Sequence, residues 1–207
     1  MQGQLWIVAA PSGGGKTSLI AEAVRVLDDV VESVSHTTRA ARPGEVEGVH
    51  YFFVEHAQFQ AMIAADGFLE YAQVFHNAYG TAASTVDALL AAGKDVILSI
   101  DWQGAQQVMA RRPDTRTVFL LPPSLDALRE RLTARGQDNP AVVAQRMTEA
   151  EAQISHYREF EYLIINEDFS RAAAELQALI QSDRLRRARR EADLQPLLHQ
   201  LGQASLA

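Results

Sequence analysis

The chain has 207 residues, of which 47% are hydrophobic and 22% charged, with a formal net charge of −7 and no cysteine. Such a composition is ordinary for a globular protein of one large or two small domains, and the acidic balance argues against a protein that coats nucleic acid. The lack of cysteine excludes a disulfide framework and thiol chemistry. No apolar run approaches the ~20 residues of a membrane span, and no basic region precedes the N-terminal apolar stretch, so we expect a cytoplasmic protein without membrane contact.

The first predicted elements are a buried strand at 5–9 and a helix at 16–27, joined by a glycine-rich loop. The loop and the start of the helix read Ala10-Pro11-Ser12-Gly13-Gly14-Gly15-Lys16-Thr17. Strand, glycine loop and helix form the context of a phosphate-binding loop, in which backbone amides surround phosphate oxygens. We expect the Lys16 ammonium to reach the β- and γ-phosphates of a nucleoside triphosphate and the Thr17 hydroxyl to ligate Mg²⁺. The alternative is a glycine-rich turn without chemistry, and Ala10 does stand where the motif has its first glycine.

A small, mostly β insertion is predicted between residues 34 and 82, where the alternation of strands and helices is interrupted. Its expected elements are β-rich pieces at 34–38 and 49–54, a helix at 56–65, a strand at 68–75 and a turn at 77–81. Between the two β-rich pieces lies a polar loop whose Pro43-Gly44 pair is typical of a turn.

The alternation resumes after this insertion. The expected elements are a helix at 83–92, a strand at 95–100, a helix at 103–111, a strand at 117–121, helices at 124–134 and 140–157, a strand at 162–166 and a largely helical stretch at 168–190. Continuous apolar strands that alternate with helices predict an α/β fold with a parallel sheet covered on both faces.

Two arginines, Arg39 and Arg42, flank the start of the polar loop. Their forked donors suit phosphate oxygens, so the pair predicts a clamp for a dianion. For an isolated pair the alternative is an exposed loop with solvated arginines. The position of this pair in an insertion beside a phosphate loop favours the clamp.

Motifs along nearly the whole chain, from about residue 4 to 182, resemble those of bacterial-type guanylate kinases in order and spacing. Besides the loop at 10–17, the motifs are Ser35-His36-Thr37-Thr38-Arg39, Arg42-Pro43-Gly44-Glu45, His50-Tyr51-Phe52-Phe53-Val54, Phe68-Leu69-Glu70, Tyr79-Gly80-Thr81, Ile100-Asp101-Trp102-Gln103-Gly104, Leu121-Pro122-Pro123-Ser124, Arg135-Gly136, Arg146 and Ile165-Asn166.

The resemblance implies a P-loop nucleoside-monophosphate-kinase fold of the α/β class. A parallel sheet core flanked by helices would be formed by 1–33, 83–123 and 158–190, a mixed β GMP-binding domain by 34–82, a helical lid by 124–157 and a C-terminal tail by 191–207. It implies a transferase of purine nucleotide metabolism that phosphorylates GMP, and dGMP as well, to the diphosphate with ATP and Mg²⁺.

The resemblance also implies roles for individual residues. The catalytic residues would be Lys16, Arg39, Arg135 and Arg146. ATP would be bound by Ala10, Pro11, Ser12, Gly13, Gly14, Gly15, Lys16, Thr17, Arg131 and Asn166. GMP would be bound by Ser35, Arg39, Arg42, Glu45, Tyr51, Glu70, Tyr79, Thr81 and Asp101. Mg²⁺ would be held by Thr17 and, through water, by Asp101.

The chemistry of guanine agrees with the role of Glu70. Guanine presents its N1–H and N2–H₂ donors side by side, and one ionised carboxylate accepts from both, whereas adenine would place a lone pair against it. Leaving such a buried charge unsatisfied is costly. The hydroxyls of Ser35 and Thr81 are expected to donate to guanine O6. A solvated carboxylate at the end of a strand is the alternative for Glu70.

Three residues depart from the family pattern. Ser99 stands where guanylate kinases commonly have a second aspartate, which puts an outer-shell magnesium or nucleotide contact in doubt there. His76 replaces a usual glycine, and Ala78 replaces the first tyrosine of a pair. Since Tyr79 is retained, we expect the phosphate clamp to survive.

The C-terminal part carries five arginines between Arg184 and Arg190, followed by leucines at 194, 197, 198 and 201. We expect a solvated helix face whose leucine stripe packs on the core or on another subunit, which allows a homo-oligomer; nucleic-acid binding is the weaker interpretation. Two functional alternatives stay open for the whole chain. One is a kinase of a sugar-phosphate acceptor, and the other is a non-catalytic guanylate-kinase-like interaction module.

Overall fold

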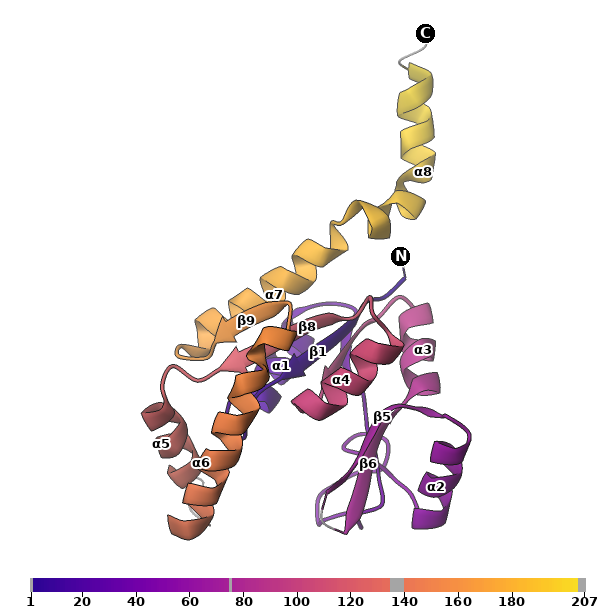
Figure 1. Ribbon diagram of the computed structural model, residues 1–207. Helices are drawn as coiled ribbons and strands as arrows, with labels where there is room; N and C mark the ends of the chain where they lie inside the picture. Colours follow the sequence, from indigo (N-terminus) through magenta and orange to yellow (C-terminus); the bar gives the residue numbers. More distant parts are fainter. Residues whose placement is uncertain (1, 75, 135–139, 205–207) are drawn as a thin grey trace.

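The core of the protein is a five-stranded parallel sheet (Figure 1). The computed structural model describes residues 2–74, 76–134 and 140–204. In spatial order the strands are β2 (Val30–Glu32), β7 (Asp95–Ser99), β1 (Leu5–Ala9), β8 (Arg116–Leu121) and β9 (Tyr162–Ile165). Every neighbouring pair is parallel. The predicted α/β fold with a parallel sheet is therefore confirmed. The short strand β2 was not predicted, because three residues carry too little pattern to be recognised.

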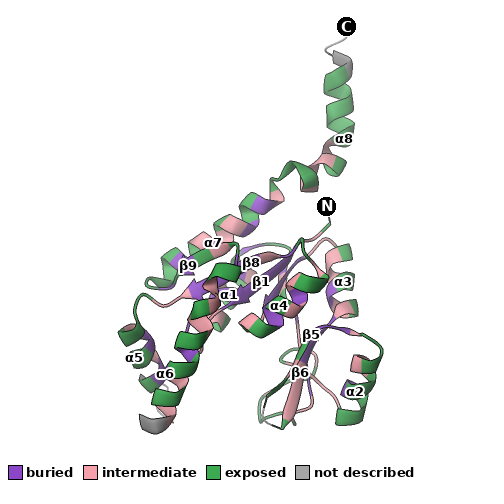
Figure 2. Ribbon diagram, in the orientation of Figure 1, coloured by how far each residue is buried: buried purple, intermediate pink, exposed green. Residues whose placement is uncertain are grey.

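Helices cover both faces of this sheet. On one face, α1 (Lys16–Val26) and α7 (Phe169–Arg184) pack against Trp6 and Val8 of β1. On the other face, α3 (Ala83–Ala91) and α4 (Trp102–Arg111) pack against the alternate residues Leu5, Ile7 and Ala9. Figure 2 shows the buried residues concentrated in the sheet and on the inner sides of these helices. Burial on both faces explains why the central strands are continuous apolar runs.

A second, mixed sheet lies beside the carboxyl edge of the core. Its strands, in spatial order, are β4 (Phe52–Phe53), β3 (His36–Thr37), β6 (Asn77–Ala82) and β5 (Phe68–Val74). The helix α2 (His56–Ala64) covers it, and its Phe59 ring stacks on Phe68 with 4.5 Å between ring centroids.

The interpretation of 77–81 as a turn is wrong. These residues belong to β6, which pairs antiparallel with both β3 and β5. Asparagine and glycine have low β propensity, so the local sequence does not indicate a strand. Pairing on both sides within the sheet overrides that local preference.

The predicted lid region forms a helical arm. It consists of α5 (Leu125–Ala134), α6 (Pro140–Ile154) and the 3₁₀ helix η1 (Ser155–Glu159). The two α-helices pack through Leu128 and Leu132 on one side and Met147 and Ala150 on the other. Figure 1 shows this arm and the second sheet extending from the same side of the core.

The C-terminal part differs from the prediction of a solvated arginine face. The expected helix at 168–190 is two helices, since α7 ends at Arg184 and α8 (Arg187–Ala204) begins in a new direction and projects from the globular part (Figure 1). Arg184 and Arg189 both bind the buried Asp95, at 2.7 and 2.6 Å. The sequence could not show these pairs because Asp95 is remote along the chain.

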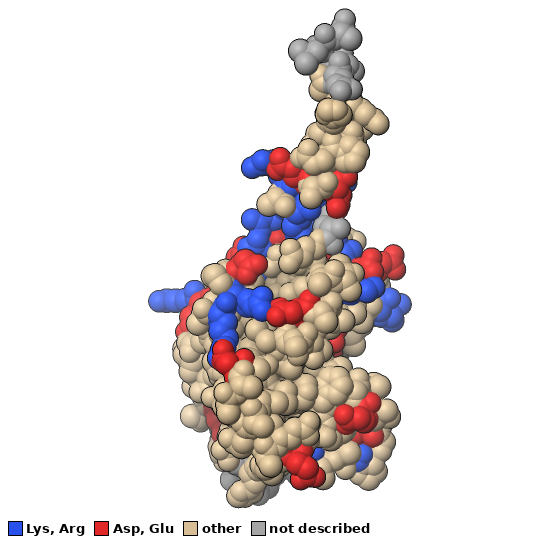
Figure 3. Space-filling view, turned by 90° about the vertical axis from the view of Figure 1, so that its right-hand side faces the viewer, with Lys and Arg blue, Asp and Glu red and all other residues tan. Residues whose placement is uncertain are grey.

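The leucine stripe of α8 does not lie on the core. Leu197, Leu198 and Leu201 are exposed, and Figure 2 shows most of α8 in the colour of exposed residues. At the root of this helix, acidic and basic side chains lie next to one another on the face seen in Figure 3. Among the described helices, α8 included, none has the length and apolar character needed to span a membrane.

Candidate active site

The glycine-rich loop joins β1 to α1 in a conformation that requires glycine. Gly13 and Gly15 have φ angles of 83° and 88°, in the left-handed region that side chains disfavour. Gly14 N–H donates to the Pro11 carbonyl at 2.9 Å and closes the turn. Gly15 directly precedes the helix, so the loop ends where unpaired amides and the helix dipole favour an anion.

Lys16 lies at the carboxyl end of the core sheet. Its ammonium donates to the Ile100 carbonyl at 2.8 Å, just beyond the end of β7. Loss of contact with water lowers the pKa of Lys16 to about 8, although the carboxylates of Asp101, Glu32 and Glu70 act in the opposite direction. A phosphate that binds here must take the ammonium away from the carbonyl and keep it protonated.

Three side chains from distant elements brace the loop. The buried Asn166, at the end of β9, donates its amide to the Gly14 carbonyl at 2.8 Å. Arg131 of α5 donates to the Asn166 carbonyl at 2.7 Å, and its other terminal nitrogen is buried and makes no hydrogen bond within the described part of the chain. Gln153 of α6 accepts from the Ser12 amide at 3.1 Å. No motif in the sequence pointed to Gln153.

The predicted phosphate clamp is occupied by the protein's own carboxylate. Both terminal nitrogens of Arg39 donate to Glu45, at 2.9 and 2.7 Å. Hydrogen bonds from the Arg39 side chain and then from the Arg42 backbone amide lower the pKa of Glu45 to about 2. The guanidinium lies 5.4 Å from the centroid of the Tyr51 ring, and Tyr79 also hydrogen-bonds to it. Arg42 itself is exposed at the rim.

Glu70 is buried at the base of the same pocket. The Thr81 hydroxyl donates to Glu70 at 2.5 Å. We expected this hydroxyl to donate to guanine O6 instead, so the structure differs from that prediction. Burial raises the pKa of Glu70; the Asp101 charge adds to this effect, whereas the hydrogen bonds from Thr81 and the Lys16 charge oppose it. A Cβ added to Gly104 would lie 3.2 Å from a Glu70 oxygen, so this glycine lets α4 approach the carboxylate closely.

The predicted residues line two adjoining hollows. The first contains Thr17 of the glycine loop together with Glu32, Ser33, Val34, Ser35, Glu45, Val49, His50, Tyr51 and Ser99. The second contains Glu70 and Tyr79 together with Ser35, Tyr51, Ala72, Val74, Ser99, Ile100 and Asp101. Ser35, Tyr51 and Ser99 line both. Asp101, besides lining the second hollow, accepts from the Gly104 amide at 2.8 Å and caps α4.

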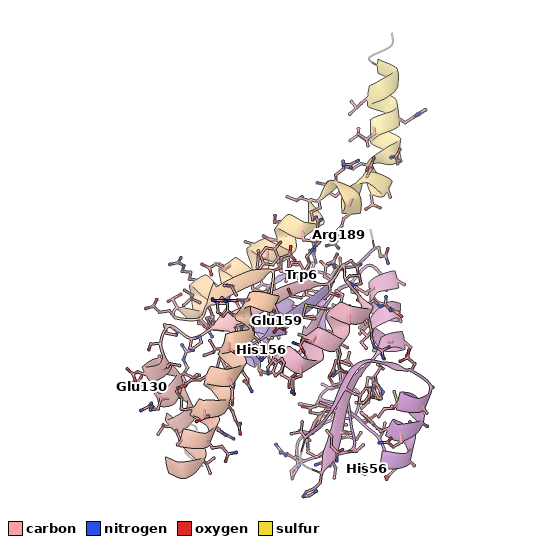
Figure 4. The ribbon with its side chains drawn as sticks, in the orientation of Figure 1. Trp6, His56, Glu130, His156, Glu159 and Arg189 are labelled. Atoms are coloured by element: carbon pink, nitrogen blue, oxygen red, sulfur yellow. The ribbon has the colours of Figure 1, made fainter. Side chains whose placement is uncertain are left out.

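Of the two arginines that we predicted in the lid, one lies within the described residues. Arg146 is half-buried on α6, whereas Arg135 lies outside the described residues. The root of the lid is fixed by an aromatic stack that the sequence did not suggest: the rings of His156 and Trp102 lie 3.5 Å apart between centroids. Figure 4 shows His156 and Glu159 next to each other at this root, and His156 Nδ1 lies 2.6 Å from a carboxylate oxygen of Glu159. The stack joins the lid to α4, which begins immediately after Asp101.

Comparisons with known proteins show the family to which the chain is similar. The guanylate kinase family profile matches residues 2–183. A guanylate kinase of Alkalilimnicola ehrlichii is 54% identical over 201 residues, which are 97% of this chain and 99% of that protein. A guanylate kinase of Escherichia coli K12 is 52% identical over 192 residues, which are 92% of this chain and 93% of that protein.

The fold agrees as well. The crystal structure of a guanylate kinase from Anaplasma phagocytophilum superposes with a TM-score of 0.71 at 30% identity and covers 91% of this chain and 89% of that one. The resemblance that the motifs indicated is thereby confirmed over nearly the full length. The chain belongs to the guanylate kinase family.

Proposed function

We propose that this chain performs the reaction of its family, transfer of the γ-phosphoryl group of ATP to GMP, in the cleft between the glycine loop and the second sheet. One observation carries the proposal. The hollow that contains Thr17 adjoins the hollow that contains Glu70, and the two share Ser35, Tyr51 and Ser99. A donor phosphate on the loop and an acceptor base on Glu70 would therefore face each other across one continuous space.

The loop side suits the triphosphate of ATP. The amides of residues 10–17 would surround its phosphates, with Lys16 on the β- and γ-phosphates and the buried free nitrogen of Arg131 directed to the same charge. Asn166 would act by bracing the loop.

The same region fits Mg²⁺. Thr17 is exposed at the first turn of α1, and the neighbouring hollows contain the carboxylates of Glu32, Glu45, Glu70 and Asp101, whose oxygens are donors that Mg²⁺ prefers. Among the described residues, no group of three or more acidic or histidine residues could cage a metal. In nucleotide sites Mg²⁺ is usually bound by one or two protein groups together with the substrate phosphates and water. Thr17 would hold the ion directly and Asp101 through water; when bound, it neutralises charge on the transferring phosphates.

The other side suits GMP. Arg39, Arg42, Tyr51 and Tyr79 would hold its phosphate, and Glu45 keeps the Arg39 fork oriented until that phosphate arrives. Glu70 would accept from the guanine N1–H and N2–H₂ groups, with the Ser35 hydroxyl beside O6, while Thr81 donates to Glu70. Since burial raises the pKa of Glu70, the two guanine donors and the Thr81 hydroxyl would also keep the carboxylate ionised.

The chain's residues would then act by positioning and by charge. The acceptor phosphate has a second pKa near 6 and needs no general base. Arg146 and Arg135 of the lid region would approach the transferring group when the lid closes. The closed lid would exclude water that would otherwise hydrolyse ATP. The His156–Trp102 stack gives that motion a fixed root.

A coupled assay of ADP formation with GMP, dGMP, AMP, UMP, ribose bisphosphate and no acceptor tests the function. We expect turnover with GMP and dGMP. Turnover with ribose bisphosphate in place of GMP would favour a sugar-phosphate kinase, and silence with every acceptor would favour an interaction module. The intact Lys16, Thr17 and Glu70 favour the kinase of GMP over both. We place the activity in the cytoplasm, where ATP and Mg²⁺ are abundant.

A homo-oligomer stays a prediction that rests on the exposed leucines of α8. Light scattering of the full chain and of a chain ending at residue 186 tests it. If the two chains form assemblies with the same number of subunits, α8 takes no part in the assembly.

A further inference from the structure

Glu32 stands at the carboxyl end of β2, next to the start of α1. In the parallel pairing of β2 with β7, Glu32 lies opposite Ile97. Ile97 and Val30, which is two residues before Glu32 and on the same face, both belong to the core cluster beneath α1. Ser99 is two residues after Ile97 and shares this face. Glu32, Ser99 and the first turn of α1 therefore meet at one edge of the sheet.

The surroundings of Glu32 are those of a functional carboxylate. It lines the hollow that contains Thr17, together with Ser99 and Tyr51. Burial raises the pKa of Glu32, whereas a hydrogen bond from the Ser99 hydroxyl and the charge of the Lys16 ammonium oppose this effect. The other carboxylate among the described residues of this hollow is Glu45, which is committed to Arg39. Among the described residues Glu32 forms no ion pair like that of Glu45 with Arg39, so its carboxylate oxygens remain available to a ligand.

We propose that Glu32 is a positioning residue that accepts hydrogen bonds from the water ligands of the magnesium ion held by Thr17 and ATP. Mg²⁺ keeps several waters in nucleotide sites, and a carboxylate beyond them orients those waters and strengthens metal binding. Ser99 alone has no charge for this purpose, but it fixes the Glu32 side chain. The contact that the sequence put in doubt at Ser99 is thus supplied from the neighbouring strand. The inference rests on the proposed function.

Binding of Mn²⁺ to the full chain with bound ADP, measured by electron paramagnetic resonance, tests the proposal without turnover. We expect Glu32→Gln to weaken Mn²⁺ binding about tenfold, the scale found for carboxylates beyond the ligands themselves. Affinity for ADP in EDTA should not fall, because the substitution removes a negative charge from the cleft. Glu55→Gln, the same change at the exposed start of α2, is the matched control and should leave both affinities unchanged.

A second substitution tests the geometry. Ser99→Asp places a carboxylate on the neighbouring strand in the same hollow, so the double variant Glu32→Gln with Ser99→Asp should regain most of the lost Mn²⁺ affinity. Should Glu32→Gln lose its circular dichroism signal, Glu32→Asp takes its place, with a smaller expected loss because the charge is kept on a shorter side chain.

Two outcomes overturn the proposal. Unchanged Mn²⁺ affinity in Glu32→Gln removes the residue from the metal site. An equal fall of ADP affinity with and without metal assigns it to the structure of the loop instead. Failure of the proposed function is distinguishable, because the wild-type chain would then form no ADP with GMP whatever its Mn²⁺ affinity.

Discussion

The donor loop and the acceptor pocket are built in different ways. The loop presents main-chain amides, and its shape is set by glycines with positive φ and by the amide of Asn166. The pocket is made of side chains that bind one another, Arg39 with Glu45 and Thr81 with Glu70. Main-chain amides recognise a phosphate chain of any nucleotide, whereas side chains can select one base. The difference places substrate selectivity on the acceptor side.

The same difference concerns what each ligand must displace. On the donor side, the Lys16 ammonium has to leave the Ile100 carbonyl, while the amides of the loop already have their conformation. On the acceptor side, a phosphate has to share the Arg39 fork with Glu45, which holds it through two hydrogen bonds. We therefore expect backbone changes to harm the donor side most and charge changes to harm the acceptor side most.

The largest effect is expected from a methyl group in the donor loop. Alanine at Gly15 would be strained at φ 88°, and its Cβ would collide with the Asn166 amide. Since a displacement of about 1 Å at a reacting group costs about a hundredfold, Gly15→Ala should lower kcat/KM for ATP by about that factor.

Gly44→Ala in the acceptor loop is the matched control, because Gly44 has the same φ of 88° and nothing within 4 Å of an added Cβ. It should cost about 1 kcal/mol of unfolding free energy, measured in urea, and leave kcat/KM for ATP unchanged. Equal losses of kcat/KM in the two variants would contradict the special fit of the donor loop.

An intermediate effect is expected at the base of the acceptor pocket. Glu70→Gln replaces two acceptors for guanine by one acceptor and one donor, and hydrogen bonds to a charged group are worth about 1.5–3 kcal/mol, so kcat/KM for GMP should fall about 10- to 100-fold. Affinity for ATP should persist, because Glu70 lines the hollow of the acceptor side. The decisive measurement is the ratio of kcat/KM for GMP to that for AMP, and a ratio equal to that of the wild-type chain would remove Glu70 from base selection.

The smallest effect is a pH dependence of the donor side. With the pKa of Lys16 lowered to about 8, the free protein carries a neutral amine above that pH and must take up one proton to bind phosphate. Affinity for a non-hydrolysable ATP analogue should therefore fall as pH rises above about 8, approaching about tenfold per pH unit. Calorimetry in buffers of different ionisation enthalpy checks the proton uptake. The Lys16→Met variant should bind the analogue more weakly and lose this pH dependence. If its affinity still falls with rising pH, another group is responsible for the dependence.

Local patterns determined much of what could be predicted. The glycine loop was recognised because its chemistry resides in consecutive residues that carry their own conformational preferences. The central strands were recognised because burial on both faces of a parallel sheet demands continuous apolar runs, as in Leu5-Trp6-Ile7-Val8-Ala9. These features set the fold class and the family without knowledge of any contact.

What the tertiary structure alone decided are contacts between residues remote in the sequence. The strand β6 exists because β3 and β5 pair with it, and Arg184 and Arg189 are held because Asp95 lies beneath them. The meeting of Glu32 with Ser99 depends in the same way on the order and register of β2 and β7. Sheet order and register follow from how all the elements share one core, and no short stretch of sequence contains that information.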